Sequence, residues 1–425
     1  MNNYRVLVIS YFFPPLSGPG VMRAFNFVKN LGRFGWEPIV LTVKDIEYVA
    51  RDEKLLEELA GIAIYRSGSL DPMRLLHLWR KRMGGRDIYQ EAGAVMKKLG
   101  RDIFPIDSKL GWLFFAQPLA KRLCRIHNIK IIIATMSPYS SGVLAYLTAK
   151  ATGLPYVLDY RDLWRGKPDI TYGSRWHKKL SVFWEKKLIA KAAAVIQVTQ
   201  RSAELFLNIY PQCSSEKVKV IFNGYDAEQF AAVARNSEPE IKFTFAGHFY
   251  GGQSPQLFLK AVQNLYDSGD LPAGVKFSFA GNYTAAIEHY FTDAPYLERL
   301  PYLKYQDYIK KLVDSDVLLL FISNNNSDMI IAQKLFDYLA ARHPILAMVP
   351  EQGETAEIIR KYKAGIICNP DSLESIRNGI SEMLAIITKG EVEQKFPLQT
   401  NDYGEFQRSR QAEQLSELLQ EISSG

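Results

Sequence analysis

The stretch that decides the fold is Arg5–Gly20, which reads RVLVISYFFPPLSGPG. Its first six residues, Arg5–Ser10, are mostly aliphatic and β-branched, as expected of a buried strand. A loop rich in Pro and Gly follows. Beyond it, apolar residues recur at helical spacing and a glycine marks the end of the helix. These residues are Val21, Phe25, Val28 and Leu31, followed by Gly35. The pattern predicts a strand, a loop and a helix in succession.

The same pattern repeats along the chain. Further strands in the first half are predicted at Pro38–Val43, Ile129–Ala134, Tyr156–Asp159 and Ala194–Val198. In the second half they are predicted at Lys242–Ala246, Val275–Ala280, Asp316–Ile322, Pro344–Val349 and Gly365–Cys368. Helices are predicted there at Leu257–Tyr266, Ala332–Ala341 and Glu354–Tyr362. Strands that alternate with helices favour parallel sheets covered on both faces.

A polar, aperiodic segment separates the two halves. It covers residues 227–240 and predicts a linker between domain 1–226 and domain 241–400, with a terminal segment 401–425. We therefore expect an α/β protein with two doubly wound domains that face a central cleft. Ligands of such sheets bind outside the carboxyl ends of the strands, so the loops after the strands are the candidate sites.

Composition narrows the class of protein. Of the 425 residues 47% are hydrophobic and 23% are charged, which fits a folded chain with a large core. Three widely separated cysteines (Cys124, Cys213 and Cys368) exclude a disulfide framework and favour a reducing compartment. Neither a membrane-spanning apolar run nor a signal peptide is expected from the sequence.

Charge is distributed unevenly. Residues 1–230 carry 34 Lys and Arg against 20 Asp and Glu, a formal charge of +14, whereas residues 231–425 carry 18 against 25, or −7. The basic residues are dense in Arg74–Arg101, where bulky apolar residues interleave them, and in Arg165–Lys191. A basic helix with an apolar face binds anionic membrane surfaces, although a solvated surface helix explains the pattern equally well. No nucleic-acid-binding motif accompanies these clusters, so nucleic acid is not an expected partner.

Two loops of the first half carry candidate binding residues. In Gly18-Pro19-Gly20, the glycines would let the backbone approach a ligand at the start of a helix, and Arg23 would add a charged contact; alternatively, the glycines only turn the chain. The second loop, Asp159–Trp164, reads DYRDLW. Its charges are costly to bury without partners. Arg161 either braces loops or holds substrate hydroxyls, and Asp162 is the stronger functional candidate.

Three segments of the second half carry further candidates. Gly247–Gly252, which reads GHFYGG, would cradle a diphosphate, with His248 as a hydrogen-bond partner or as a structural residue. Lys334 and Asp337 lie i,i+3 on one helix face, and either pair with each other or bind a diphosphate and a ribose. Gly353-Glu354-Thr355 either presents N–H groups to phosphate or forms an ordinary helix cap.

The sequence gives little indication of a metal. Asp314-Ser315-Asp316 has the D-x-D spelling of some metal sites, but it stands at the end of a helix just before a buried strand. Capping is the preferred interpretation, because hard cations need several converging oxygen ligands. No zinc spacing, Walker loop or kinase motif set is present.

Taken together, these motifs resemble bacterial GT-B glycosyltransferases of family four, in the branch with a D-F-R-D-x-W motif. The segments that carry the resemblance are Ser10–Pro15 with Gly18–Arg23, Ser137-Pro138, Asp159–Trp164, Ile221–Asp226 (IFNGYD) and Lys334–Ala340 (KLFDYLA). The resemblance implies two Rossmann-like domains, with the acceptor on the first and a nucleotide-sugar on the second. It also implies that the final helix, Phe406–Ile422, returns to the first domain.

The implied reaction is a retaining transfer that requires no metal. The donor would be a UDP- or GDP-linked sugar and the acceptor a lipid-linked surface glycan, at the inner face of the cytoplasmic membrane. The residues implied in catalysis are Asp162 and Lys334. Those implied in donor binding are Gly247, His248, Tyr302, Lys334, Asp337, Glu354 and Thr355. Those implied in acceptor binding are Gly18, Gly20, Arg23, Ser137 and Arg161.

The sequence departs from the family pattern in three places. The family has two glutamates eight residues apart; here Asp337 fills the second place and Met329 the first, with Asp328 one residue out of register. The Arg and Lys pair after the first strand of the second domain is missing, and so is a histidine near Ser137-Pro138. Two alternatives therefore stay open: a sugar-nucleotide epimerase of the same fold, and a non-catalytic binding module.

Overall fold

The computed structural model describes residues 4–48, 50–74, 77–78, 104–166, 172, 174–236, 239–249, 252–325 and 331–424. The chain forms two compact units. Unit 1 consists of Met1–Asn223 together with Arg408–Gly425, and unit 2 of Gly224–Gln407. Because the last segment belongs to unit 1, the chain passes between the units twice.

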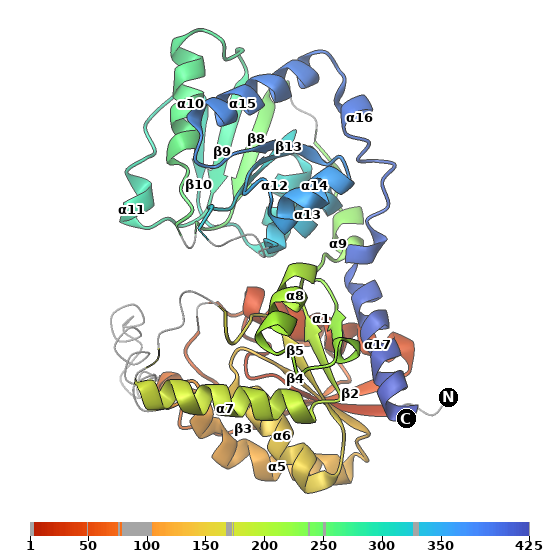
Figure 1. Cartoon of the computed structure of the whole chain (residues 1–425). Helices are drawn as coiled ribbons and strands as arrows, with labels where there is room; N and C mark the ends of the chain where they lie inside the picture. The colour runs from red at the N-terminus through yellow and green to blue at the C-terminus, as the bar shows by residue number, and fades with distance from the viewer. Residues whose placement is uncertain are drawn as a thin grey trace. The chain divides into compact units, whose positions relative to one another are not determined.

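The described part of unit 1 contains a seven-stranded parallel sheet with helices on its faces (Figure 1). The strand order is β3-β2-β1-β4-β5-β6-β7. The strands are β1 (Tyr4–Ile9), β2 (Trp36–Val43), β3 (Ala63–Ser67), β4 (Ile131–Thr135), β5 (Tyr156–Tyr160), β6 (Ala194–Gln197) and β7 (Val218–Val220). The order changes direction between β1 and β4, which makes the carboxyl end of this pair the expected ligand position.

The helices of unit 1 pack against the sheet or against one another. They are α1 (Pro19–Leu31), α2 (Lys54–Glu57), α5 (Leu113–Ile126), α6 (Ser140–Thr152), α7 (Arg175–Lys191), α8 (Gln200–Ile209) and α17 (Arg408–Ser424). In α1, the four residues predicted to share a face, Val21, Phe25, Val28 and Leu31, are all buried. Proline at the first helical position and left-handed Gly35 (φ 83°) just beyond the following 3₁₀ turn delimit this helix.

The last helix completes the core of the first unit. Leu415, Leu418 and Leu419 of α17 are buried in the same cluster as Val28 and Trp36. The hydroxyl of Ser416 also donates to the carbonyl of Phe34 at 3.2 Å. Figure 1 shows α17, in blue, beside the N-terminal elements in red.

Unit 2 repeats the architecture with a six-stranded parallel sheet in the order β10-β9-β8-β11-β12-β13. The strands are β8 (Ile241–Ala246), β9 (Val275–Ala280), β10 (Leu297–Leu300), β11 (Val317–Phe321), β12 (Ile345–Met348) and β13 (Gly365–Cys368). The helices are α9 (Ala227–Ala231), α10 (Gln256–Asp267), α11 (Ala285–Glu288), α12 (Tyr305–Val313), α13 (Gln333–Ala341), α14 (Glu354–Lys361), α15 (Leu373–Thr388) and α16 (Val392–Lys395). Here the order changes direction between β8 and β11. The prediction of an α/β protein with two doubly wound sheets is confirmed.

Candidate functional site

In unit 2, the carboxyl ends of β8 and β9 lie unusually close to the start of α13. Gly247, just after β8, has a φ of 137°, and a Cβ atom there would lie 2.5 Å from the Nζ atom of Lys334. A Cβ atom on Gly281, just after β9, would collide with the carbonyl oxygen of Gly247. Glycine at position 247 therefore leaves room for the Lys334 side chain, and glycine at position 281 leaves room for the backbone of Gly247.

The ammonium of Lys334 sits in a poorly solvated position. Its Nζ atom lies 4.3 Å from the ring centre of Phe245 on β8 and 3.5 Å from the carbonyl oxygen of His248. Burial lowers the pKa of Lys334 to about 8, and the carboxylate of Asp337 offsets only part of that effect. An anion bound at this position would therefore gain a strong electrostatic partner and would raise the pKa of the lysine.

His248 and Tyr302 form a pair at the same end of the sheet. Their rings are nearly parallel, 16° apart, with centres separated by 6.0 Å. The Nδ1 atom of His248 lies 2.9 Å from the carbonyl oxygen of Asn282, which fixes the ring. Tyr302 is exposed, so one face of this pair is open for a flat ligand to stack on.

Asp337 lies one turn along α13 from Lys334 and is buried. One of its carboxylate oxygens accepts a hydrogen bond of 3.0 Å from the hydroxyl of Tyr308 on α12. Burial and the neighbouring carboxylate raise the pKa of Tyr308 well above its usual value, so the hydroxyl stays protonated and holds the carboxylate in place. Neither Tyr308 nor Phe245 was predicted as a site residue from the sequence.

Glu354 and Thr355 occupy the first turn of α14, which follows β12 in the same sheet. Both side chains are buried. The capping residue Gly353 provides no side-chain hydrogen bond to the helix. Their role in donor binding stays a prediction.

In unit 1, Arg161 connects the loops that follow β1 and β4. One guanidinium nitrogen donates to the carbonyl of Gly20, and the other donates to the carbonyl of Ser137 at 3.1 Å. A Cβ atom on Gly20 would lie 2.9 Å from Arg161 and 3.1 Å from the hydroxyl of Tyr48. The structure thus brings together three predicted acceptor residues, Gly20, Ser137 and Arg161. Gly18, with a φ of 118°, precedes α1 in the same loop.

Arg23 points into the protein. Its guanidinium forms hydrogen bonds of 2.8 to 3.1 Å with both carboxylate oxygens of Asp159, which is completely buried. It also donates to the carbonyl of Phe222 at 3.0 Å and to the side chain of Asn223 at 3.2 Å. Arg23 therefore connects α1 to the end of β5 and to the segment that follows β7. A direct contact of Arg23 with an acceptor stays a prediction.

The rest of the segment Asp159–Trp164 is fixed by other partners. The hydroxyl of Tyr139 donates to the carbonyl of Leu163 at 3.0 Å, and the Tyr139 ring stacks on Trp164 at 4.5 Å. The indole nitrogen of Trp164 donates to Ser181 at 2.7 Å. Asp162, in the middle of this segment, is half-buried and contributes to the raised pKa of Tyr139, of which burial is the main cause.

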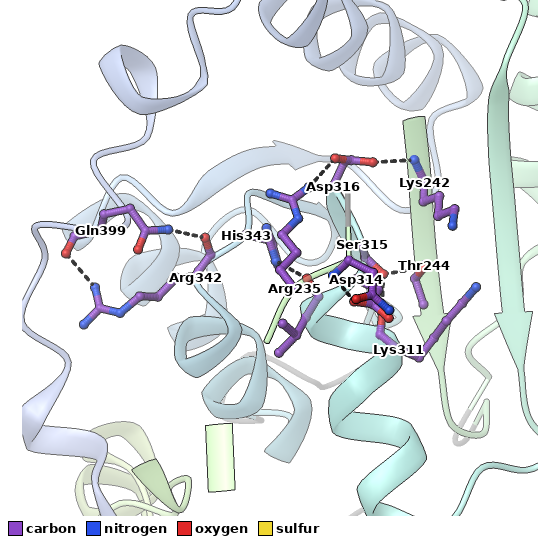
Figure 2. Close-up of polar contacts among 12 residues, drawn as sticks. Arg235, Lys242, Thr244, Lys311, Asp314, Ser315, Asp316, Arg342, His343 and Gln399 are labelled. Atoms are coloured by element: carbon purple, nitrogen blue, oxygen red, sulfur yellow. Dashed lines mark hydrogen bonds and ion pairs between the residues drawn. The ribbon is translucent and has the colours of Figure 1, made fainter. Parts of the chain in front are cut away.

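The D-x-D segment precedes β11 and so lies at the amino ends of the strands, away from their carboxyl ends. Figure 2 shows the contacts of its two aspartates. Asp314 accepts hydrogen bonds of 2.8 Å from Lys310 and from the backbone N–H of Asn236. Asp316 accepts from Arg235 at 2.5 Å and from the backbone N–H of Lys242 at 2.8 Å. These carboxylates connect the end of α12 to the amino ends of β8 and β11. This arrangement is the one we expected for residues that cap a helix. Across the described ranges, no group of three or more His, Cys, Asp or Glu side chains is placed to hold a metal ion.

Some predicted features fall on residues that the structure does not describe. Asp328 and Met329 lie outside the described residues, as do residues 75–76 and 79–103 of the first basic cluster. Among the helices that the structure does describe, none has the length and apolarity needed to cross a bilayer.

Comparisons with known proteins agree with this architecture. Residues 21–224 match the family model of a glycosyl transferase 4-like domain. No curated protein sequence matches the chain. A glycosyltransferase structure from Rickettsia africae superposes with a TM-score of 0.66 at 13% identity, covering 99% of both chains. The structure of HepE from Anabaena in complex with UDP superposes with a TM-score of 0.61 at 14% identity, covering 98% of this chain and 100% of the other.

A third similar structure is WaaG, a glycosyltransferase involved in lipopolysaccharide biosynthesis. It gives a TM-score of 0.59 at 12% identity, covering 97% of this chain and 99% of the other. The chain therefore has the GT-B fold of glycosyltransferases. Its first unit carries a glycosyl transferase 4-like domain, which confirms the resemblance to that class.

Proposed function

We propose that the protein is a retaining glycosyltransferase that moves a sugar from a nucleotide-diphosphate-sugar to a glycan acceptor. The observation that carries this proposal is the desolvated ammonium of Lys334 against Gly247, at the carboxyl end of β8 where the strand order changes direction. Ligands of doubly wound sheets bind at this position. The presence of UDP in the similar HepE structure supports a nucleotide diphosphate as the ligand.

Departure of a nucleotide diphosphate concentrates negative charge on its oxygens. In the proposed reaction the Lys334 ammonium and the backbone N–H groups near Gly247 and at the start of α14 stabilise that charge, so no metal is required. Asp337 accepts the ribose hydroxyls, and the His248–Tyr302 pair contacts the donor. Glu354 and Thr355 line the donor phosphates. The donor carries uracil or guanine as its base.

The acceptor is proposed to bind the loops of unit 1 that Arg161 connects, at Gly18, Gly20 and Ser137, with Asp162 at the reacting hydroxyl. Arg23 shapes these loops through Asp159. For a transfer that retains configuration, the acceptor oxygen bonds to the anomeric carbon as the carbon–phosphate-oxygen bond breaks on the same face. The proton of the acceptor hydroxyl passes to the departing phosphate, so a protein base is unnecessary.

We further propose that the acceptor is a lipid-linked surface glycan at the inner face of the cytoplasmic membrane. The excess of positive charge in residues 1–230 supports this setting, since anionic lipids attract basic surfaces. The similarity to WaaG, which is involved in lipopolysaccharide biosynthesis, points in the same direction.

The donor site is tested by calorimetry of the purified chain with UDP, GDP and ADP. We expect one of the first two to bind, and Lys334→Ala to weaken that binding by about 10- to 100-fold, the usual effect of losing a hydrogen bond to a charged group, roughly 1.5–3 kcal/mol. The matched control is Lys260→Ala on α10, an exposed lysine of the same unit, which should leave binding unchanged. Equal binding by both variants would remove Lys334 from the site.

The reaction is tested by following release of the nucleotide from its sugar conjugate. Release that requires an added lipid-linked acceptor supports transfer, and Asp337→Ala should suppress it. Conversion of the sugar without any acceptor would instead identify an epimerase. Failure of all three nucleotides to bind would favour a non-catalytic module.

A further inference from the structure

Helix α7 has one buried face and, opposite to it, an exposed face with large apolar side chains. Its inner face, formed by Ser181, Glu185, Leu188 and Ile189, is buried in unit 1. Ser181 on this face accepts the hydrogen bond from Trp164. Figure 1 shows α7 along the outside of unit 1, where it packs against α6. The inner face therefore attaches the helix to the unit.

The outer face carries three large apolar side chains that are exposed and so are not packed into the described part of the unit. Trp176 is 73% exposed, Leu180 42% and Phe183 55%. Their spacing of four and then three residues places them in one line along the helix. Large apolar side chains that gather on an exposed face mark an interaction surface.

Basic residues border this line. Arg175, Lys179, Lys186, Lys187 and Lys191 of α7 lie on or beside the line by helical spacing, whereas the single acidic residue of the helix, Glu185, is buried on the inner face. The Nζ atom of Lys179 lies 5.3 Å from the ring centre of Trp176, and that of Lys187 lies 5.3 Å from the ring centre of Phe183. The aliphatic parts of these lysines thus extend the apolar surface while their charges stay at its border.

We propose that the outer face of α7 docks on an anionic lipid bilayer. The apolar line would enter the interface between headgroups and acyl chains, and the bordering lysines would contact lipid phosphates. Charge argues against a second copy of the chain as the occupant, because pairing two such faces would bring like charges together. The proposal rests on the proposed function only for its setting at a membrane, since it uses neither the donor nor the acceptor residues.

The test is co-sedimentation of the full chain with vesicles of phosphatidylcholine alone or with 30% phosphatidylglycerol. We expect binding only to the anionic vesicles and weaker binding at high salt. Combining Trp176→Ala, Leu180→Ala and Phe183→Ala should reduce vesicle partitioning at least tenfold. Each of Lys179→Gln, Lys186→Gln and Lys191→Gln should reduce it by up to about fivefold. The matched control combines Lys260→Gln with Tyr266→Ala on α10, two exposed residues of unit 2, and should bind like the unaltered chain.

Tryptophan fluorescence gives a second readout. A blue shift on addition of anionic vesicles that disappears in Trp176→Phe would place this residue in the lipid interface. Equal partitioning of the triple variant and the control would overturn the proposal. The proposal would also be overturned if the chain formed a dimer that the triple variant abolishes, or if it bound RNA that the vesicles do not displace. Calorimetry with nucleotide on the same variants separates the two proposals, because loss of vesicle binding with intact nucleotide binding concerns α7 alone.

Discussion

At the scale of single residues, Lys334 shows how a fold prepares a charge for a ligand. The lysine lies against an aromatic ring at the end of a strand, and the Asp337 carboxylate offsets part of the loss of solvent. The protein therefore holds this ammonium at a cost that a bound anion would relieve. Binding energy and protonation are coupled at this one atom.

This coupling predicts a pH dependence of nucleotide binding. With a pKa of about 8 in the free protein, Lys334 is protonated below pH 7 and loses its proton between pH 8 and 9. A bound diphosphate raises the pKa, so binding takes up a proton in this range. The association constant should be flat below pH 7 and fall above pH 8, approaching tenfold per pH unit. Calorimetry in buffers of different ionisation enthalpy measures both effects. In Lys334→Arg, which stays charged, the fall should disappear.

Arg23 illustrates a different use of charge. Because Asp159 is completely buried, removing Arg23 would leave a carboxylate without its ion-pair partner in the core. We expect Arg23→Met to lower the free energy of unfolding of unit 1 by about 3–5 kcal/mol. Arg5→Met is the control, since the ion pair of Arg5 with Glu37 is about 40% exposed and should contribute about 0–1 kcal/mol. Urea denaturation measures the free energy of unfolding of both variants. Similar losses of stability in Arg23→Met and Arg5→Met would contradict the structural role of Arg23.

At the scale of elements, the ends of β8 and β9 determine where a ligand can approach. Both strands stop at glycines whose missing side chains leave room for a neighbouring backbone and for Lys334. The opposite ends of β8 and β11 are instead closed by ion pairs and hydrogen bonds around Asp314 and Asp316 (Figure 2). In the proposed function the ligand binds at the carboxyl ends of the strands, whereas these contacts hold the amino ends together.

A glycine substitution tests this difference between the two ends of the strands. Gly247→Ala would place a methyl group against Lys334, whereas Gly274→Ala, before β9, meets no atom within 4 Å. Both positions have a positive φ and should lose about 1–2 kcal/mol of stability. Only Gly247→Ala should also weaken nucleotide binding, by at least tenfold in calorimetry. An equal loss of affinity in both variants would mean that strain, and not displacement of Lys334, is responsible.

The strands show what the sequence could and could not predict. The central strands β8, β9, β11 and β12 were predicted within one residue, because most of their residues are buried and their sequences are rich in apolar and aromatic residues. The strands β3, β7 and β10 were missed. All three are edge strands with mostly partly buried or exposed residues, so their sequences lack that apolar run. Their pairing depends on a neighbouring strand that is distant in sequence.

The candidate site residues were also predicted only in part from the sequence. Strand ends and glycines indicated Gly247, Lys334 and Arg161, because these residues follow predictable strands or helices. The contacts of Lys334 with Phe245, of Asp337 with Tyr308 and of Arg161 with Gly20 join separate elements. Such contacts follow from tertiary packing, which local periodicity does not encode.

At the scale of the whole molecule, α17 makes the first unit discontinuous in sequence. Ending the chain at Gln407 would remove Leu415, Leu418 and Leu419 from the core of unit 1. At about 1.5–3 kcal/mol for each buried leucine, the loss is roughly 5–9 kcal/mol, comparable to the stability of a whole domain. We expect the truncated chain to lose the thermal transition of unit 1 and to keep that of unit 2. Differential scanning calorimetry measures both thermal transitions. The control is Glu421→Gln, a substitution of an exposed residue of α17, which should leave both transitions unchanged.

The discontinuity of unit 1 also orders events on the ribosome. The sheet of the first unit is complete once the residues up to β7 have emerged, but the apolar groove beside α1 stays open until the last helix is translated. Unit 2, whose residues are contiguous, has all of its sequence available earlier. The nascent chain therefore exposes an unfilled hydrophobic seam for as long as unit 2 takes to be made, which is the interval when a chaperone would find a binding site on it.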